Sequence, residues 1–139
     1  MEKYRRIMGV GLLFSLILLN MGCDEVLECV FNIEPEIHDR PLELGILGER
    51  YRDRITAEIS NEVNDDDYIY TFTVFGDIPP GIGFDIERRS IVFFGVPEEV
   101  GTYRFEVELS VESYDLEGYD GSPTCSDQTV REFRIQVVD

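Results

Sequence analysis

Hydrophobic and polar residues alternate with a period of two along most of the chain after residue 29. The clearest examples lie at residues 68–75, 103–111 and 132–137. Such alternation gives a β-strand one apolar and one polar face, so each segment is predicted to be a half-buried strand. Residues 91–94 are all apolar, which is typical of a strand buried on both faces.

Residues that favour turns separate these segments, and no stretch predicts an amphipathic helix of ten or more residues. The turn signals are Gly76-Asp77, Pro79-Pro80-Gly81, Gly95-Val96-Pro97, Gly101 and the stretch 118–123. Several short strands joined by regular turns predict an all-β protein, specifically a β-sandwich of about seven strands.

Four motifs occur in the order found in one family of sandwich domains. They are Ile78-Pro79-Pro80-Gly81-Ile82-Gly83-Phe84-Asp85, Phe94-Gly95-Val96-Pro97, Gly101-Thr102-Tyr103-Arg104-Phe105-Glu106-Val107 and the opening Leu47-Gly48-Glu49-Arg50-Tyr51. Together they resemble the He-PIG-like immunoglobulin (Ig) domains, which are related to cadherin-like and dystroglycan-type modules. The resemblance implies an Ig-like/cadherin-like β-sandwich over residues 37–139. The chain departs from the family at the charged hairpin 87–90 and at a long acidic loop, 114–128.

The first 22 residues have the pattern of a secretory signal peptide. Lys3, Arg5 and Arg6 precede thirteen residues without a charge, positions 7–19. An apolar run of that length suits a signal sequence, whereas a membrane-spanning helix needs about 20 apolar residues. We therefore expect the segment to direct export.

The stretch Leu19-Asn20-Met21-Gly22-Cys23 resembles the lipobox of bacterial lipoproteins. The resemblance implies cleavage before Cys23 and acylation of that cysteine, which would anchor the protein in a membrane. Asn20 departs from the family, which has an apolar residue there. An uncleaved signal-anchor and an ordinary secreted protein are the alternatives. Asp24 resembles an inner-membrane retention signal, so whether the anchor lies in the inner or the outer membrane of the bacterial envelope is left open.

These features predict three segments: a signal peptide at 1–22, an acylated cysteine with a short tether at 23–36, and the sandwich at 37–139.

Removing the signal peptide also changes the net charge of the protein. The whole chain has 12 basic and 29 acidic residues, a net charge of −17. The signal peptide holds three of the basic residues and one acid, so the exported part carries nine and 28, a net charge of −19. Such a protein repels polyanions, which excludes nucleic acid as a partner.

Three cysteines occur, and Cys23 is assigned to lipid. Cys29 and Cys125 remain as an even pair in an oxidising compartment, which predicts a disulfide that closes a loop of about 96 residues. Two free thiols or intermolecular pairing are the alternatives.

The residues with candidate chemistry are few. His38 is the only histidine, so neither a catalytic triad nor a zinc site is predicted, and the protein is not expected to be an enzyme or to need a cofactor. Acidic loops supply the oxygen ligands that calcium prefers, which makes calcium the one metal considered. The candidate ligands are Asp65, Asp67, Asp115, Glu117 and Asp120.

The expected function is that of a non-catalytic binding or structural module for an envelope protein or a glycan. This expectation rests on the fold, which hosts many functions. Tyr114 and Tyr119, in the acidic loop, are the candidate contacts with a partner. A calcium-dependent adhesion module is the alternative, and a hydrolase is a weaker one.

Overall fold

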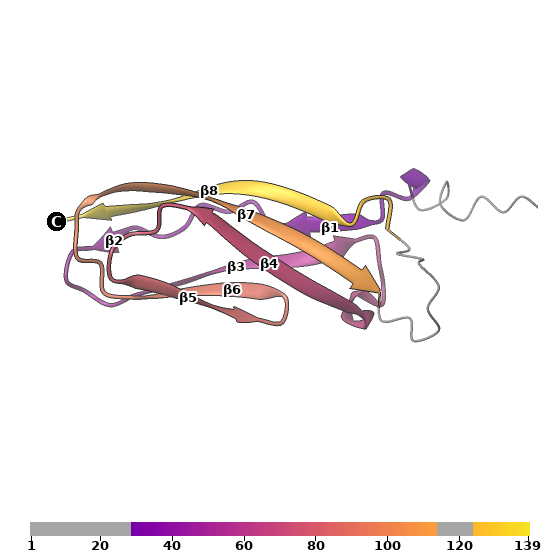
Figure 1. Ribbon diagram of the computed structural model, residues 1–139, viewed down its shortest axis with the longest axis horizontal. Helices are drawn as coiled ribbons and strands as arrows, with labels where there is room; N and C mark the ends of the chain where they lie inside the picture. Colours follow the sequence, from indigo (N-terminus) through magenta and orange to yellow (C-terminus); the bar gives the residue numbers. More distant parts are fainter. Residues whose placement is uncertain (1–28, 114–123) are drawn as a thin grey trace, which may run out of the picture.

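The computed structural model describes residues 29–113 and 124–139, which form two packed four-stranded sheets (Figure 1). The elements are β1 (Glu34–Ile37), β2 (Gly45–Ile46), β3 (Tyr51–Ser60), the 3-10 turn η1 (Asp65–Asp67), β4 (Tyr68–Gly76), β5 (Ile82–Glu87), β6 (Ser90–Gly95), β7 (Gly101–Ser113) and β8 (Gln128–Val138). β1 begins at Glu34 and so lies partly within the segment predicted as a tether.

The order of the strands identifies an Ig-like sandwich. One sheet has the order β1-β3-β6-β5 and the other β2-β8-β7-β4. In Ig terms these are the A-B-E-D sheet and the G-F-C sheet, with the first strand divided between them. β2 is the short second half of that strand and pairs in parallel with β8. The predicted all-β sandwich is therefore confirmed, with eight strands because the divided first strand counts twice.

The alternation in the sequence corresponds to the two faces of each sheet. The inward residues of β7 and β8 include Phe105, Val107, Phe133 and Ile135, all of which are buried. An aromatic contact connects the two sheets, because the ring centroids of Phe93 on β6 and Phe105 on β7 lie 5.1 Å apart. Within the second sheet, the ring centroids of Phe105 and Phe133 lie 6.1 Å apart. In antibody domains a disulfide and a tryptophan occupy the centre of the core; here phenylalanine rings fill it.

Tyr103 forms the tyrosine corner that is typical of Ig folds. It lies near the start of β7, and its hydroxyl donates to the backbone carbonyl of Glu99, 3.4 Å away. In antibody domains this tyrosine precedes a core cysteine by two residues. Phe105 stands at that position here, which is consistent with the aromatic core.

The Pro-Pro-Gly motif and the Gly-Val-Pro motif form two turns that are joined by backbone hydrogen bonds. The amide of Val96 donates to the carbonyl of Gly81 at 3.0 Å, and the amide of Glu98 donates to that of Pro80 at 2.9 Å. Gly81 has a φ of +85°, and a Cβ atom there would lie 2.0 Å from the carbonyl oxygen of Val96. Close approach of two backbones therefore explains why glycine stands at this position.

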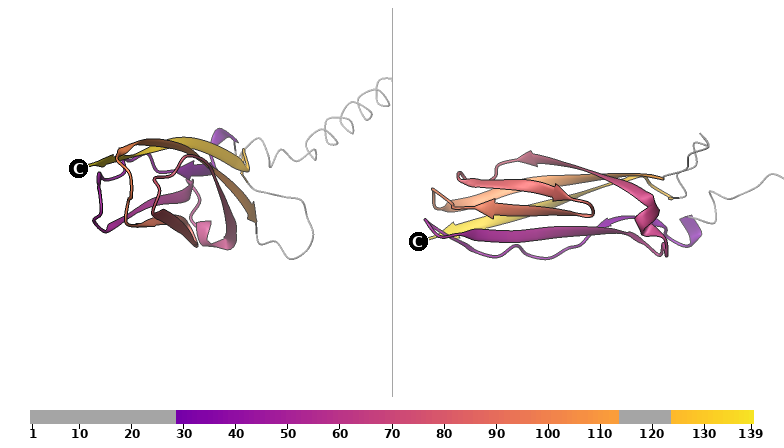
Figure 2. Two further views of the ribbon diagram at one scale, coloured as in Figure 1. Left: turned by 60° about the vertical axis from the view of Figure 1, so that its left-hand side comes forward. Right: turned by 90° about the horizontal axis from the view of Figure 1, so that it is seen from below.

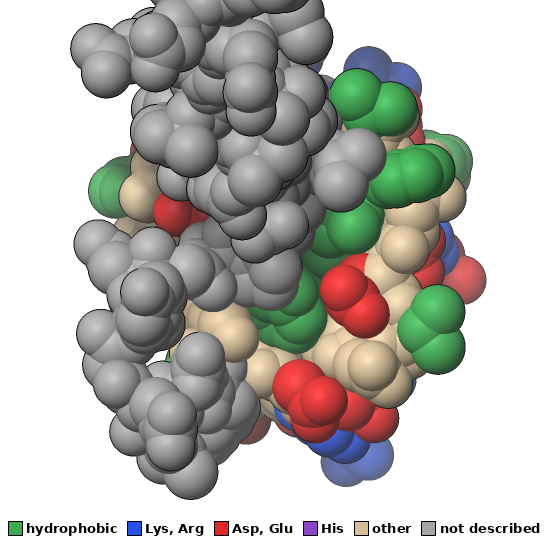
Figure 3. Space-filling view, turned by 90° about the vertical axis from the view of Figure 1, so that its right-hand side faces the viewer, with side chains coloured by type: hydrophobic (Ala, Val, Ile, Leu, Met, Phe, Trp, Pro, Cys, Tyr) green, Lys and Arg blue, Asp and Glu red, His purple; other side chains and the backbone are tan. Residues whose placement is uncertain are grey.

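The two ends of the sandwich differ. The C-terminus lies at one end, and the first described residues lie at the other, together with the ends of β3 and β7 (Figures 1 and 2). A disulfide joins Cys29 to Cys125 at that second end, as predicted, and the amide of Cys125 donates to the carbonyl of Ile33 at 2.8 Å. We call this end the disulfide end; its visible surface shows acidic and hydrophobic side chains side by side (Figure 3).

Candidate functional site

The acidic residues considered for calcium are only partly within the described structure. Asp65 and Asp67 form η1, at the disulfide end. Arginines of the β5–β6 hairpin engage this turn: Arg89 pairs with Asp65, and Arg88 lies 3.2 Å from Asp66. In the described part of the chain no three His, Cys, Asp or Glu side chains form a group suited to a metal. Calcium binding stays a prediction.

Several predicted residues lie outside the described structure. They are Cys23, Tyr114, Asp115, Glu117, Tyr119 and Asp120. Within residues 29–113 and 124–139, no helix has the length and apolar character needed to cross a bilayer. His38 is described, and its ring bonds to the hydroxyl of Thr56 at 2.7 Å and lies 3.5 Å from Glu58.

Residues 38–44 cross from one sheet to the other and are held by a buried carboxylate. The Asp53 side chain is only 6% exposed and pairs with Arg40. It also accepts hydrogen bonds from the amides of Glu43 and Arg54, at 2.8 and 2.7 Å. Because a buried charge needs such partners, Asp53 fixes the path of the crossing segment.

Replacing Asp53 with asparagine should destabilise the fold by about 1–3 kcal/mol, since the neutral amide loses charge-assisted bonds and leaves buried donors poorly paired. Urea unfolding of purified protein is the measurement. Glu87→Gln is the matched control, because Glu87 pairs with Arg54 while both side chains are half exposed, and such surface pairs contribute less than about 1 kcal/mol. Equal losses in the two variants would contradict this account of Asp53.

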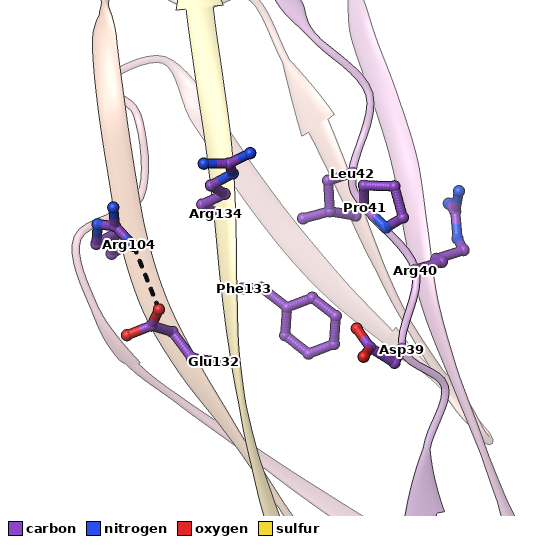
Figure 4. A pocket seen from close by; sticks show the side chains of 8 residues that line it. All are labelled: Asp39, Arg40, Pro41, Leu42, Arg104, Glu132, Phe133 and Arg134. Atoms are coloured by element: carbon purple, nitrogen blue, oxygen red, sulfur yellow. Dashed lines mark hydrogen bonds and ion pairs between the residues drawn. The ribbon is translucent and has the colours of Figure 1, made fainter.

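A hollow of about 350 Å³ lies between the crossing segment and β8 (Figure 4). Its lining residues are Asp39, Arg40, Pro41, Leu42, Arg104, Glu132, Phe133 and Arg134. We call it the crossover pocket. Arg104, Glu132 and Arg134 form one wall, the crossing segment forms the opposite wall, and the ring of Phe133 lies between them (Figure 4). Phe133 is 5% exposed, so it forms the floor.

The charged residues of the crossover pocket are nearly all paired. Arg104 lies 3.3 Å from Glu132, Asp39 lies 3.1 Å from Arg131, and Arg40 pairs with Asp53. Arg134 has no ion pair with any residue of the described structure. It also lies directly opposite Arg104 in the register of β7 and β8, where like charges repel. The pocket therefore carries one uncompensated positive charge.

A second hollow of about 350 Å³ lies at the end opposite the disulfide. Arg50, Tyr51, Arg52 and Phe94 are among its lining residues, and Arg50 likewise lacks an ion pair within the described structure. The Tyr51 hydroxyl is buried without a hydrogen-bond partner among the described residues. Burial, and then the nearby charges of Asp53 and Glu43, raise the pKa of Tyr51, so its hydroxyl stays neutral at physiological pH.

The sequence alone did not predict the crossover pocket. Arg104 and Arg134 are 30 positions apart, and only the pairing of β7 with β8 makes them neighbours. The one signal in the sequence was indirect, since acidic residues outnumber basic ones by 29 to 12, so an arginine without an acidic partner is unexpected.

Comparison with known proteins adds information on the fold. No protein-family model matches the chain, and no curated protein does. An endo-fucoidan hydrolase of glycoside hydrolase family 107 is similar with a TM-score of 0.53 and 18% identity, over 84% of this chain and 18% of the hydrolase. The titin Ig tandem A164-A165 is similar with a TM-score of 0.46 and 11% identity, over 76% of this chain and 50% of the tandem. Titin domain M4 is similar with a TM-score of 0.46 and 8% identity, over 77% of this chain and 98% of the titin domain.

The chain thus spans half of the titin tandem and less than a fifth of the hydrolase. At these identities the similarity concerns the fold alone. The hydrolase similarity, with the strand order described above, supports an all-β sandwich, and the Ig-like assignment rests on that strand order.

Proposed function

We propose that the protein is an envelope lipoprotein, anchored through acylated Cys23, whose single Ig-like domain binds an envelope protein or glycan without catalysis. The crossover pocket is the observation that supports this function most directly. It is a concave site of a size that suits ligand binding, and it combines an apolar floor with a few polar groups. The Ig-like fold is compatible with this function but does not specify it.

Anchoring at Cys23 would hold the disulfide end of the domain near the membrane. Cys29 is held at the disulfide end, and it lies six positions after Cys23. A fully extended chain of that length reaches about 20 Å, so the disulfide end would lie within that distance of the membrane. Two or three acyl chains hold a protein stably at a bilayer. The crossover pocket is lined by residues 39–42 and by residues of β7 and β8, and not by the cysteines of the disulfide end.

Lipidation can be tested by labelling cells that express the full chain with an alkyne analogue of palmitate. We expect label on the natural protein and none on Cys23→Ser, because the thiol that accepts the lipid is absent. Asn20→Leu restores the apolar residue of the lipobox and should raise the labelled fraction. Label that persists on Cys23→Ser would contradict the anchor and leave the binding function to be judged separately.

Binding through the crossover pocket can be tested by photo-crosslinking in the same cells. A photoreactive residue at Leu42, on the pocket wall, should give a discrete adduct with an envelope component. The same residue at Thr73 is the control, because Thr73 is exposed on β4 and is not among the residues that line the pocket. Adducts of equal yield at both positions, or none at either, would argue against this site.

A further inference from the structure

We infer that the crossover pocket binds a saccharide that carries one anionic group, either a carboxylate or a sulfate ester. This inference rests on the proposed binding function and names the ligand class of the same site. It begins from Arg134, which is exposed and has no acidic partner among the described residues, although the exported chain has 28 acids and nine arginines.

The charge balance of the pocket favours a single negative charge. Each of the other charged lining residues has a partner: Arg104 has Glu132, Asp39 has Arg131, and Arg40 has Asp53. An anion beside Arg134 would therefore complete the pairing without displacing an existing partner. It would also relieve the repulsion between Arg134 and Arg104, which lie directly opposite each other on the neighbouring strands β8 and β7. The planar guanidinium suits the paired oxygens of a carboxylate or a sulfate.

The remaining lining groups suit the rest of a sugar. Asp39 and Glu132 have side chains that are 82% and 61% exposed, so oxygen lone pairs not used by their arginines can accept hydrogen bonds from hydroxyl groups. Pro41, Leu42 and the floor of Phe133 offer apolar surface for the C–H face of a ring. A volume of about 350 Å³ lies at the lower end of the range for ligand pockets, which fits one or two sugar units.

A peptide ligand fits this site less well. Peptides commonly bind as an added strand along a free sheet edge. All four outer strands, β1, β2, β4 and β5, have an unpaired edge, whereas the walls of the pocket are made of charged and apolar side chains. Recognition in this pocket would therefore depend on side-chain groups, which suits a compact ligand better than an added strand.

Calorimetric titration of the full-length protein, purified in detergent at 0.15 M salt, tests the inference. The probes are a trisaccharide with one uronate, the same trisaccharide with one sulfate ester in place of the uronate, and its neutral form. We expect at least one charged probe to bind at least about tenfold more tightly than the neutral one, since hydrogen bonds between a guanidinium and an anion are roughly twice as strong as neutral ones. Comparison of the two charged probes shows which anion is preferred.

Arg134→Gln should weaken binding of the preferred probe at least tenfold. Arg50→Gln is the matched control, because it removes another unpaired arginine at the far hollow, and it should leave affinity within twofold. If Arg134→Gln lowers the melting temperature, Arg134→Lys serves instead, since it keeps the charge, loses the planar fork and should still weaken binding severalfold.

Other outcomes separate this inference from the proposed function. Equal binding of charged and neutral probes, or equal losses in the Arg134 and Arg50 variants, would overturn the anionic ligand while the pocket stays a glycan site. No binding of any probe, together with a specific protein adduct at Leu42, would overturn the saccharide and leave the binding module standing. No binding and no adduct at Leu42 would overturn both.

Discussion

Replacing both Cys29 and Cys125 with serine is expected to lower the free energy of unfolding by about 4 kcal/mol. The disulfide closes a loop with a sequence separation of 96, and in the chain-entropy account a loop of that length contributes about 4–5 kcal/mol. Without the bond, the first described residues are held to β8 and its preceding loop mainly by backbone contacts such as that between Cys125 and Ile33. Urea unfolding of the double variant measures the loss.

Reduced natural protein provides the control, because it lacks the bond but keeps both cysteine side chains. It should match the double variant within about 1 kcal/mol, a margin that covers the exchange of thiol for hydroxyl at a surface position. A double variant as stable as the oxidised protein would mean that the bond does not constrain the unfolded chain.

The second large effect is expected at Gly81. An alanine Cβ there would lie 2.0 Å from the carbonyl oxygen of Val96, and the residue would keep a φ of +85°. The backbone strain of alanine at a positive φ and the forced separation of the two hydrogen-bonded turns would each destabilise the protein, together by about 3 kcal/mol or more. The measurement is thermal or urea unfolding of purified Gly81→Ala.

Gly83→Ala is the matched control for Gly81→Ala. Gly83 lies two residues further along, in β5, and a Cβ there would meet no atom within 4 Å. We expect this variant to be as stable as the natural protein or more stable by less than about 1 kcal/mol, because alanine restricts the unfolded chain. Similar losses in the two variants would show that the contact between the turns is not what requires glycine at position 81.

The strands could be predicted from the sequence because each has one face in the core. Period-two alternation follows directly from that burial, as in β7, where Phe105, Val107 and Leu109 are buried and the residues between them are not. The prediction for residues 91–94 was right for the first three, but Phe94 is 39% exposed, because it faces outward near the end of β6. Alternation shows the face of a residue and not how much of that face is covered.

The candidate site was not predictable in the same way. The sequence drew attention to acidic loops, and in the part of them that is described, arginines engage Asp65 and Asp66. Those arginines, 88 and 89, appeared in the sequence only as a departure from the family hairpin. Whether two charges meet depends on which loops share an end of the sandwich, and that is fixed by strand order.

By itself, the sequence determined the all-β sandwich, predicted the pairing of Cys29 with Cys125 that the structure contains, and predicts export and a lipid anchor at Cys23. These conclusions depend on local patterns: alternation, turn residues, spacing and an even cysteine count. Tertiary structure alone decided that Arg134 lies opposite Arg104 and that residues 38–44 form one wall of a pocket with β8. It also decided that seven of the nine arginines after residue 22 have acidic partners within the described residues. The physical reason is that register and sheet order bring distant residues together, and no single stretch of the chain contains that information.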